Sequence, residues 1–371
     1  MTASEVQPRE GLVTDTSTTT SRPTSRRWML KATAALCVAF ALPAAGFPSA
    51  HADQGRNSNT AYVTNSEDDT VSVISARTNT VTATVPVGDG PFAVSVTPDG
   101  RTAYVTNFVD DTVSVISTRT NTVTDTIPVG DGPSAVAVAP NGRTAYVVAN
   151  GDGSVSVIST RTNTVTATIP VAFAPQGVAV SPDSRTVYVP ASGNDTLSVI
   201  SARTNTVTAT IPVGNTPLGG VAVTPDGRTV YVTNFGDETV SVISARTNTV
   251  TATIPVGAPQ AVAVSPDGRT AYVTSAFAQG EVSVISTRTN TVTDTIPVGD
   301  APLAVAFAPK GRTAYVTNAN DNTVSVIDTR TDTVTATIPV GNAPRGVAVA
   351  PKHTKPSHEV GPDTPRPRQR P

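Results

Sequence analysis

Seven tyrosines divide most of this chain into units of nearly equal length. Successive tyrosines are separated by 42, 42, 42, 43, 41 and 43 residues, and they are Tyr62, Tyr104, Tyr146, Tyr188, Tyr231, Tyr272 and Tyr315. Repeats of about 40 to 50 residues are typical of β-propeller blades, none of which can bury its apolar face alone. The period therefore favours one closed repeat architecture over two ordinary domains.

Each unit has the composition and the turn residues of four short strands. The unit at residues 90–130 alternates branched apolar residues with Ser, Thr and Ala, so that each kind of side chain occupies one face of a strand. Its hairpins contain Pro98-Asp99-Gly100 and Thr120-Asn121, where Gly and Asn tolerate the positive φ of tight turns. We therefore predict an all-β fold of four-stranded blades.

The two ends of the repeat region complement each other. The chain enters the pattern at a second strand, residues 60–65, and leaves it after a first strand, residues 346–350. Pairing of these segments would complete one blade and remove the open sheet edges that invite aggregation. The sequence thus predicts a seven-bladed β-propeller whose ring is closed by pairing of the N- and C-terminal strands.

The first 52 residues have the features of an export signal. Residues 25–31 read Ser-Arg-Arg-Trp-Met-Leu-Lys, an apolar run follows over 32–45, and Ala50-His51-Ala52 offers a small-x-small cleavage pattern. The signal resembles the twin-arginine type with a long polar n-region, and a general secretory signal is the alternative. We predict cleavage after Ala52, secretion or display at the cell surface of a bacterium, and no transmembrane segment in the mature chain.

These signals predict the domain organisation. Residues 1–52 form the signal peptide, 53–58 a short leader, 59–351 the propeller and 352–371 a tail rich in Pro and Arg. Because the tail lacks apolar periodicity, we expect it to be disordered.

The four-residue motif Tyr-Val-Thr-Asn at residues 62–65, 104–107, 231–234 and 315–318 resembles the repeat of the YVTN family of β-propeller proteins. The resemblance covers residues 59–350, with departures at 148–150, at Pro190 and at Ser275. It implies a propeller that is often exported or displayed at the cell surface, but no single activity. Similar-looking propellers that act as lactonases, or as lyases on cyclic peptides, depend on channel-mouth histidines, and no histidine of the repeat region can be mapped onto them.

The repeat region contains few groups that carry chemistry. The only cysteine, Cys37, precedes the predicted cleavage point, and the three histidines, His51, His353 and His358, lie outside residues 59–351. General acid–base catalysis would therefore have to use carboxylates with shifted pKa values. We expect no catalytic residues and no bound cofactor, and we leave enzymatic activity open with the balance against it.

Charged residues recur at both rims of the predicted ring. Those of the loops after the tyrosine strands are Asp68, Asp69, Asp110, Asp111, Asp152, Asp195, Asp237, Glu238, Glu281 and Asp321. They could hold Ca²⁺, but an acidic residue repeated at a turn more commonly accepts hydrogen bonds from backbone amides. Arginines recur at the other rim beside aspartates, so local ion pairs are favoured and a nucleic-acid partner is not expected.

Positions that differ between otherwise uniform repeats are the candidates for ligand recognition, because the identical positions serve the shared scaffold. The ligand-binding candidates are Phe92, Phe108, Ser134, Phe173, Gln176, Leu218, Phe235, Gln260, Phe277, Leu303 and Arg345. Aromatic side chains with a few orienting polar groups are typical of ligand sites. The alternative is that the phenylalanines only pack the loops.

The sequence thus favours an exported, non-enzymatic, monomeric propeller that binds a small molecule, a glycan or a protein through one loop rim, without a metal. Two alternatives stay open. One is a lactonase- or lyase-like propeller enzyme that uses rim carboxylates with a divalent metal, and the other is a structural protein of the cell surface.

Overall fold

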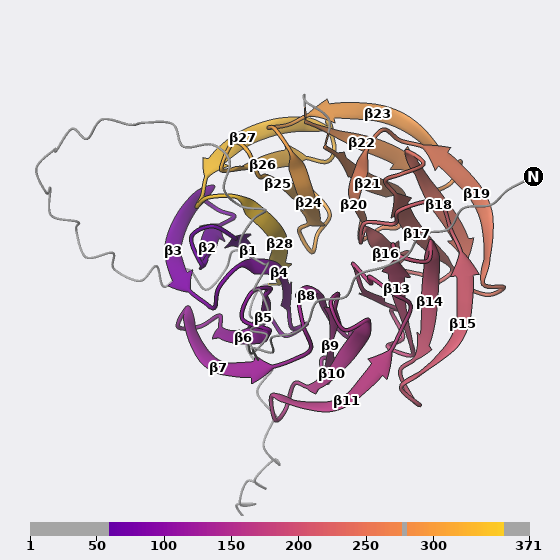
Figure 1. Cartoon of the computed structure of the whole chain (residues 1–371). Coiled ribbons are helices and arrows are strands. Elements are labelled where there is room, and N and C mark those ends of the chain that lie inside the picture. The colour runs from indigo at the N-terminus through magenta and orange to yellow at the C-terminus, as the bar shows by residue number, and fades with distance from the viewer. Residues whose placement is uncertain (1–58, 277–279, 352–371) are drawn as a thin grey trace, which may run out of the picture. The chain divides into compact units, whose positions relative to one another are not determined.

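The computed structural model describes residues 59–276 and 280–351, and these form seven four-stranded antiparallel sheets arranged in a ring (Figure 1). The predicted seven-bladed β-propeller is confirmed. The predicted signal peptide (1–52), leader (53–58) and tail (352–371) lie outside the described residues. In the described part of the chain, no helix has the length and apolar character needed to cross a membrane.

Every blade contains one strand of each of four kinds. The innermost strands are β4 (Pro91–Val96), β8 (Pro133–Val138), β12 (Ala179–Val180), β16 (Val221–Val223), β20 (Pro259–Val264), β24 (Pro302–Phe307) and β28 (Pro344–Ala350). The second strands are β1 (Thr60–Asn65), β5 (Thr102–Asn107), β9 (Thr144–Ala149), β13 (Thr186–Ala191), β17 (Thr229–Asn234), β21 (Thr270–Ser275) and β25 (Thr313–Asn318). The third strands are β2 (Thr70–Ser75), β6 (Thr112–Ser117), β10 (Ser154–Ser159), β14 (Thr196–Ser201), β18 (Thr239–Ser244), β22 (Glu281–Ser286) and β26 (Thr323–Asp328). The outermost strands are β3 (Thr80–Pro86), β7 (Thr122–Pro128), β11 (Thr164–Pro170), β15 (Thr206–Pro212), β19 (Thr249–Pro255), β23 (Thr291–Pro297) and β27 (Thr333–Pro339).

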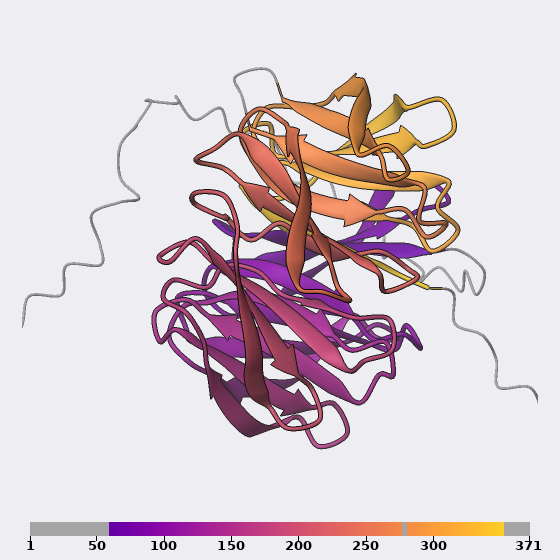
Figure 2. The same cartoon turned by 90° about the vertical axis from the view of Figure 1, so that its right-hand side faces the viewer.

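The chain runs once around the ring, so blade order follows sequence order. Blades 1 to 6 are β4–β7, β8–β11, β12–β15, β16–β19, β20–β23 and β24–β27, and blade 7 is β28-β1-β2-β3. The magenta blades of the first half therefore lie opposite the orange blades of the second half (Figure 2).

Blade 7 is assembled from both ends of the repeat region. Its innermost strand β28 pairs antiparallel with β1, with Ala61 opposite Val349 and Val63 opposite Val347. With β28 in place, the innermost strand of every blade lies between the innermost strands of the two adjacent blades. The ring therefore has no open blade. The predicted closure is confirmed.

An apolar layer fills each junction between blades. Between blades 1 and 2 it contains Tyr104, Val113, Val147 and Ile158, all fully buried, and equivalent layers occur at the other junctions. Second and third strands are buried on both faces because they lie between two neighbouring blades. The apolar residues that recur in each repeat therefore form seven similar cores, one at each junction between blades.

The repeated tyrosine also links neighbouring blades through its hydroxyl group. The Tyr104 hydroxyl donates a hydrogen bond to Asn163 Oδ1 at 2.9 Å, and Tyr231 donates to Asn290 Oδ1 at 3.0 Å. Both asparagines have a φ of 51° to 54°, as a tight turn requires. Asn at this turn therefore has two roles, the positive φ and the acceptor for a tyrosine of the preceding blade.

Replacement of Tyr104 by Phe should lower the free energy of unfolding by about 1 to 2 kcal/mol, because Asn163 loses its hydrogen-bond donor at a half-buried position. Tyr146 is a matched control, since its hydroxyl forms no hydrogen bond with a described residue. Denaturant unfolding of both variants measures the difference. Equal losses for Tyr104→Phe and Tyr146→Phe would show that the bond to Asn163 does not stabilise the fold.

Candidate functional site

The loops that vary between repeats lie on one face of the ring, which we call the loop face. In blade 1 it comprises the loop at 108–111, after the second strand, and the loop at 87–90, before the innermost strand. Backbone hydrogen bonds join these loops, from Phe108 N to Gly90 O at 3.0 Å and from Val109 N to Asp89 O at 3.2 Å. The opposite face, which we call the turn face, carries the tight turns at 97–101 and 118–121 and their equivalents.

The acidic residues of the loop face accept hydrogen bonds from backbone amides. Asp110 Oδ2 accepts from Asp89 N at 2.8 Å, and Asp111 Oδ1 accepts from Gly132 N at 2.7 Å. Similar bonds are made by Asp68, Asp152, Asp237 and Asp321. In residues 59–276 and 280–351, no group of three or more His, Cys, Asp or Glu could hold a metal ion. The carboxylates therefore stabilise the loops, and the structure assembles no calcium site from them.

Three of the candidate residues form a cluster with Ser66 where the innermost strands begin. The rings of Phe92 and Phe108 are 5.7 Å apart between centroids and inclined by 33°. The Arg345 guanidinium lies over the Phe92 ring, with Cζ 4.7 Å from the centroid, and Arg345 Nε donates to Ser66 Oγ at 3.1 Å. These four residues, from blades 1 and 7, are the Phe–Arg cluster.

Within residues 59–276 and 280–351, the charge of Arg345 has no carboxylate partner at ion-pair distance. Ion pairs among the described residues join neighbours on the turn face, at Asp99–Arg101, Asp226–Arg228 and Asp328–Arg330. Arg345 is half-buried, and its Nη atoms form no hydrogen bond with a described residue. Burial lowers the pKa of Arg345, while the charge of Glu67 acts in the opposite direction. A guanidinium in this state favours an anionic ligand.

The loop face is asymmetric because two blades depart from the repeat. In blade 7, Thr64 Oγ1 accepts from Gly346 N at 2.8 Å and donates to Phe92 O at 3.0 Å, so the threonine bridges two innermost strands. Val148 and Pro190 replace this threonine in blades 2 and 3, and neither side chain can form the bridge. The innermost strands that follow, β12 and β16, are shortened to two and three residues.

The other candidates lie outside the cluster. Ser134 is buried and donates to Gln176 O at 3.4 Å, whereas Phe173 is 69% exposed. Half-buried or partly exposed candidates at corresponding loop positions are Gln176, Leu218, Phe235, Gln260 and Leu303. Among the described residues, no ring contact links Phe173 or Phe235 to another aromatic side chain. Phe277 lies outside the described residues.

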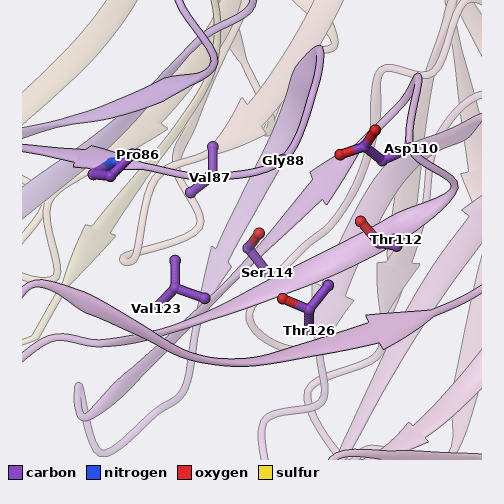
Figure 3. Close-up of a pocket in the computed structure, with 8 residues that line it drawn as sticks. All are labelled: Pro86, Val87, Gly88, Asp110, Thr112, Ser114, Val123 and Thr126. Atoms are coloured by element: carbon purple, nitrogen blue, oxygen red, sulfur yellow. The ribbon is translucent and has the colours of Figure 1, made fainter.

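Sequence reasoning did not find a groove at the junction of blades 7 and 1, toward the outside of the loop face. It has a volume of about 430 Å³ and is lined by Pro86, Val87, Gly88, Asp110, Thr112, Ser114, Val123 and Thr126 (Figure 3). An equivalent groove of about 460 Å³ lies at the junction of blades 3 and 4. Since the lining follows the repeat, the groove belongs to the shared scaffold and does not distinguish one junction from another.

Side chains with a nitrogen or sulfur atom that commonly coordinates a transition metal are absent from the described propeller. Residues 59–276 and 280–351 contain no His, Cys or Met. The tyrosines are buried, and the hydroxyl groups of Tyr104 and Tyr231 point to asparagines of the turn face. Lys310, the one lysine of this range, lies in a turn of the turn face. The loop face can therefore offer aromatic rings, amides, a guanidinium and carboxylates already bonded to backbone amides, but no imidazole, thiolate or thioether among the described residues.

Two known families match the sequence. Residues 139–351 match the family described as Cytochrome D1 heme domain, and residues 27–141 match the family described as YNCE-like beta-propeller. Both support membership of a propeller family. No curated protein sequence is significantly similar to the chain.

Solved structures share the architecture. A chain of Kuenenia stuttgartiensis hydrazine synthase is 25% identical, with 69% of this chain and 88% of that chain covered and a TM-score of 0.64. A functionally unknown protein from Desulfotomaculum acetoxidans DSM 771 is 18% identical, with coverages of 79% and 99% and a TM-score of 0.71. Dihydro-heme d1 dehydrogenase NirN in complex with DHE is 18% identical, with coverages of 81% and 77% and a TM-score of 0.63. The latter two show the fold alone.

The family match corrects the function and the cofactor expected from the sequence. A non-enzymatic binder without a cofactor is wrong, because more than half of the chain matches a haem domain. The alternatives of a metal-dependent lactonase or lyase and of a surface structural protein fall with the same finding. The expectation relied on missing histidines, but a cofactor that carries the chemistry removes the need for acid–base side chains. The chain belongs to the family described as Cytochrome D1 heme domain.

Proposed function

We propose that the loop face holds a tetrapyrrole of the haem type and that the protein takes part in a redox reaction of that group. The family match over residues 139–351 supports the class of ligand. The Phe–Arg cluster supports the loop face as the binding site. The observation that carries the proposal is the Arg345 guanidinium beside two aromatic rings, without an ion-pair partner among the described residues. When bound, such a group supplies the electron-transfer chemistry, and the protein binds and orients it.

The cluster fits the periphery of a tetrapyrrole. The macrocycle is flat and conjugated, and its acidic side groups are anionic at neutral pH. Phe92 and Phe108 offer aromatic surface for the macrocycle, because aromatic pairs gain about 0.5 to 1.5 kcal/mol beyond the burial of area. Arg345 offers the planar fork of donors that suits a carboxylate.

The residues do not fit the central iron. Haem iron in proteins is held by His, Cys, Met or Tyr. The first three are absent from the described residues, and the tyrosines are enclosed between blades. The site therefore matches the edge and the plane of the ligand but supplies no axial side-chain ligand from residues 59–276 and 280–351.

Replacement of Arg345 by Gln should weaken the binding of hemin to the purified protein about tenfold or more, because a charge-assisted hydrogen bond contributes about 1.5 to 3 kcal/mol. Titration followed by the Soret absorbance measures the affinity. Arg330→Gln is the matched control: it also removes one positive charge, but from an exposed ion pair on the turn face, 3.9 Å from Asp328. We expect the control to change the affinity less than about twofold. Unaltered binding by Arg345→Gln, or no binding by the unaltered protein, would refute the proposal.

We also propose that the protein is exported and is a member of the YVTN repeat family. The Ser-Arg-Arg sequence at residues 25–27, the apolar run at 32–45 and Ala50-His51-Ala52 support a twin-arginine signal that is cleaved after Ala52. The repeated Tyr-Val-Thr-Asn supports the family. The proposed location is outside the cytoplasm, either secreted or at the cell surface.

Export is tested by fractionation of the host and by the mass of the recovered protein. The expected species starts at Asp53 and is found outside the cytoplasm. Replacement of Arg26 and Arg27 by Lys should retain the protein in the cytoplasm if the twin-arginine route is used. Continued export of this double variant would leave the general secretory route as the mechanism.

A further inference from the structure

We infer that the Phe–Arg cluster recognises the plane and the carboxylates of a tetrapyrrole but not its central metal, so that it takes a metal-free porphyrin about as well as haem. This inference rests on the proposed function, and it concerns which part of the ligand the protein recognises. It follows because the chain matches a family of haem domains, whereas its described residues offer no His, Cys or Met to hold the iron.

The first observation is the position of the tyrosines, the one residue type in residues 59–276 and 280–351 among those that hold haem iron in proteins. Tyr104 and Tyr231 are at most 1% exposed, and each hydroxyl is engaged with an asparagine at about 3 Å. Burial raises the pKa of Tyr104 to about 12, so its phenolate is disfavoured. A metal on the loop face would therefore find no phenolate ligand.

The second observation is the use of the nearby carboxylates. Asp69 Oδ1 accepts a hydrogen bond from Gly90 N at 2.9 Å, and Asp110 Oδ2 accepts from Asp89 N at 2.8 Å, beside Phe92 and Phe108 in sequence. Coordination of a metal would compete with these bonds and would release the loops that hold the two rings. These two carboxylates thus maintain the loops that carry the rings, whereas Glu67, next to Ser66 along the chain, is exposed.

The third observation is that contacts within the chain hold the Phe–Arg cluster together. Arg345 is held by Ser66 at 3.1 Å and by the Phe92 ring, so its position costs little further side-chain entropy on binding. The rings would meet the plane of a macrocycle and Arg345 would meet its carboxylates, so no group of the cluster would meet the central metal. The affinity should follow the carboxylates and the aromatic surface, which haem and its metal-free form share.

The test compares two probes on the unaltered full-length protein, hemin and metal-free protoporphyrin IX, by calorimetric titration under the same conditions. We expect dissociation constants within about threefold of each other, and losses of about tenfold or more for both probes in Arg345→Gln. A second readout is the hemin complex itself, whose Soret band should shift on addition of imidazole, because the described residues offer no His, Cys or Met that would hold the iron.

The outcomes separate the inference from the proposed function. Hemin bound about 30-fold or more tightly than the metal-free probe, with a Soret band insensitive to imidazole, would overturn the inference and leave haem binding in place. Binding of neither probe would overturn the proposed function and the inference with it. Similar affinities that both depend on Arg345 would support the inference.

Discussion

Removal of β28 by ending the chain at Ala343 is expected to abolish the cooperative thermal unfolding of the propeller. The truncation takes away the innermost strand of blade 7, which pairs with β1 and contributes Val347 to the apolar layer shared with blade 6. It leaves β1 as an unpaired edge and opens the ring. We expect a loss of at least about 5 kcal/mol, or roughly 10 °C or more in Tm if a transition remains.

A truncation after Pro351 is the control, since it keeps every described strand. Its unfolding transition, followed by circular dichroism, should match that of the chain ending at Pro371. A chain ending at Ala343 that melts as a monomer at the original temperature would show that pairing of β28 with β1 does not hold the ring closed.

Replacement of Ile243 by Ala is expected to lower the free energy of unfolding by about 2 to 5 kcal/mol. Ile243 is fully buried on β18 and packs with Tyr188, Leu197 and Val230 in the layer between blades 3 and 4. The layer cannot collapse onto the missing atoms without moving a whole blade, so the cavity term should be large.

Val250 provides the matched position on the paired strand. It lies opposite Ile243 in the register of β18 and β19 but is 39% exposed. Val250→Ala should cost less than about 1 kcal/mol, as measured by the same denaturant titration. Similar costs at the two positions would mean that the junctions between blades are not the main source of stability.

The fold could be predicted because short stretches of sequence determine each strand and turn of a blade, and these stretches recur in every repeat. The tyrosine period defines the blade, the turn residues separate its strands, and the incomplete units at residues 60–65 and 346–350 define the closure. What the sequence did not predict is the shortening of β12 and β16. Just before these two strands the backbone of blade 3 approaches that of blade 4, where a Cβ on Gly177 would lie 2.0 Å from Gly219 O, and a single repeat does not specify such a contact between blades.

The site was predicted less completely. Variation between repeats gives eleven candidate residues, and Phe92, Phe108 and Arg345 are among them. It does not show that these three, and not the other eight, lie together. Their contact depends on ring closure, because Arg345 on β28 meets Phe92 on β4 only when both ends of the repeat region are brought together. Position in a single repeat carries no information about such contacts.

The error about function has a chemical cause. The absence of histidines from the repeat region weighs against catalysis only when side chains perform the reaction. In a haem domain the bound group carries out the chemistry, and the protein needs side chains that bind and orient that group. Aromatic rings and an arginine are such groups, and Phe92, Phe108 and Arg345 are among the binding residues that variation between repeats predicts.

The most direct measurement is a crystal structure of the protein grown with protoporphyrin IX. We expect the macrocycle on the loop face, against Phe92 and Phe108, with a carboxylate of the ligand within hydrogen-bond distance of Arg345. A macrocycle bound on the turn face, or a loop face without ligand at saturating concentration, would contradict it.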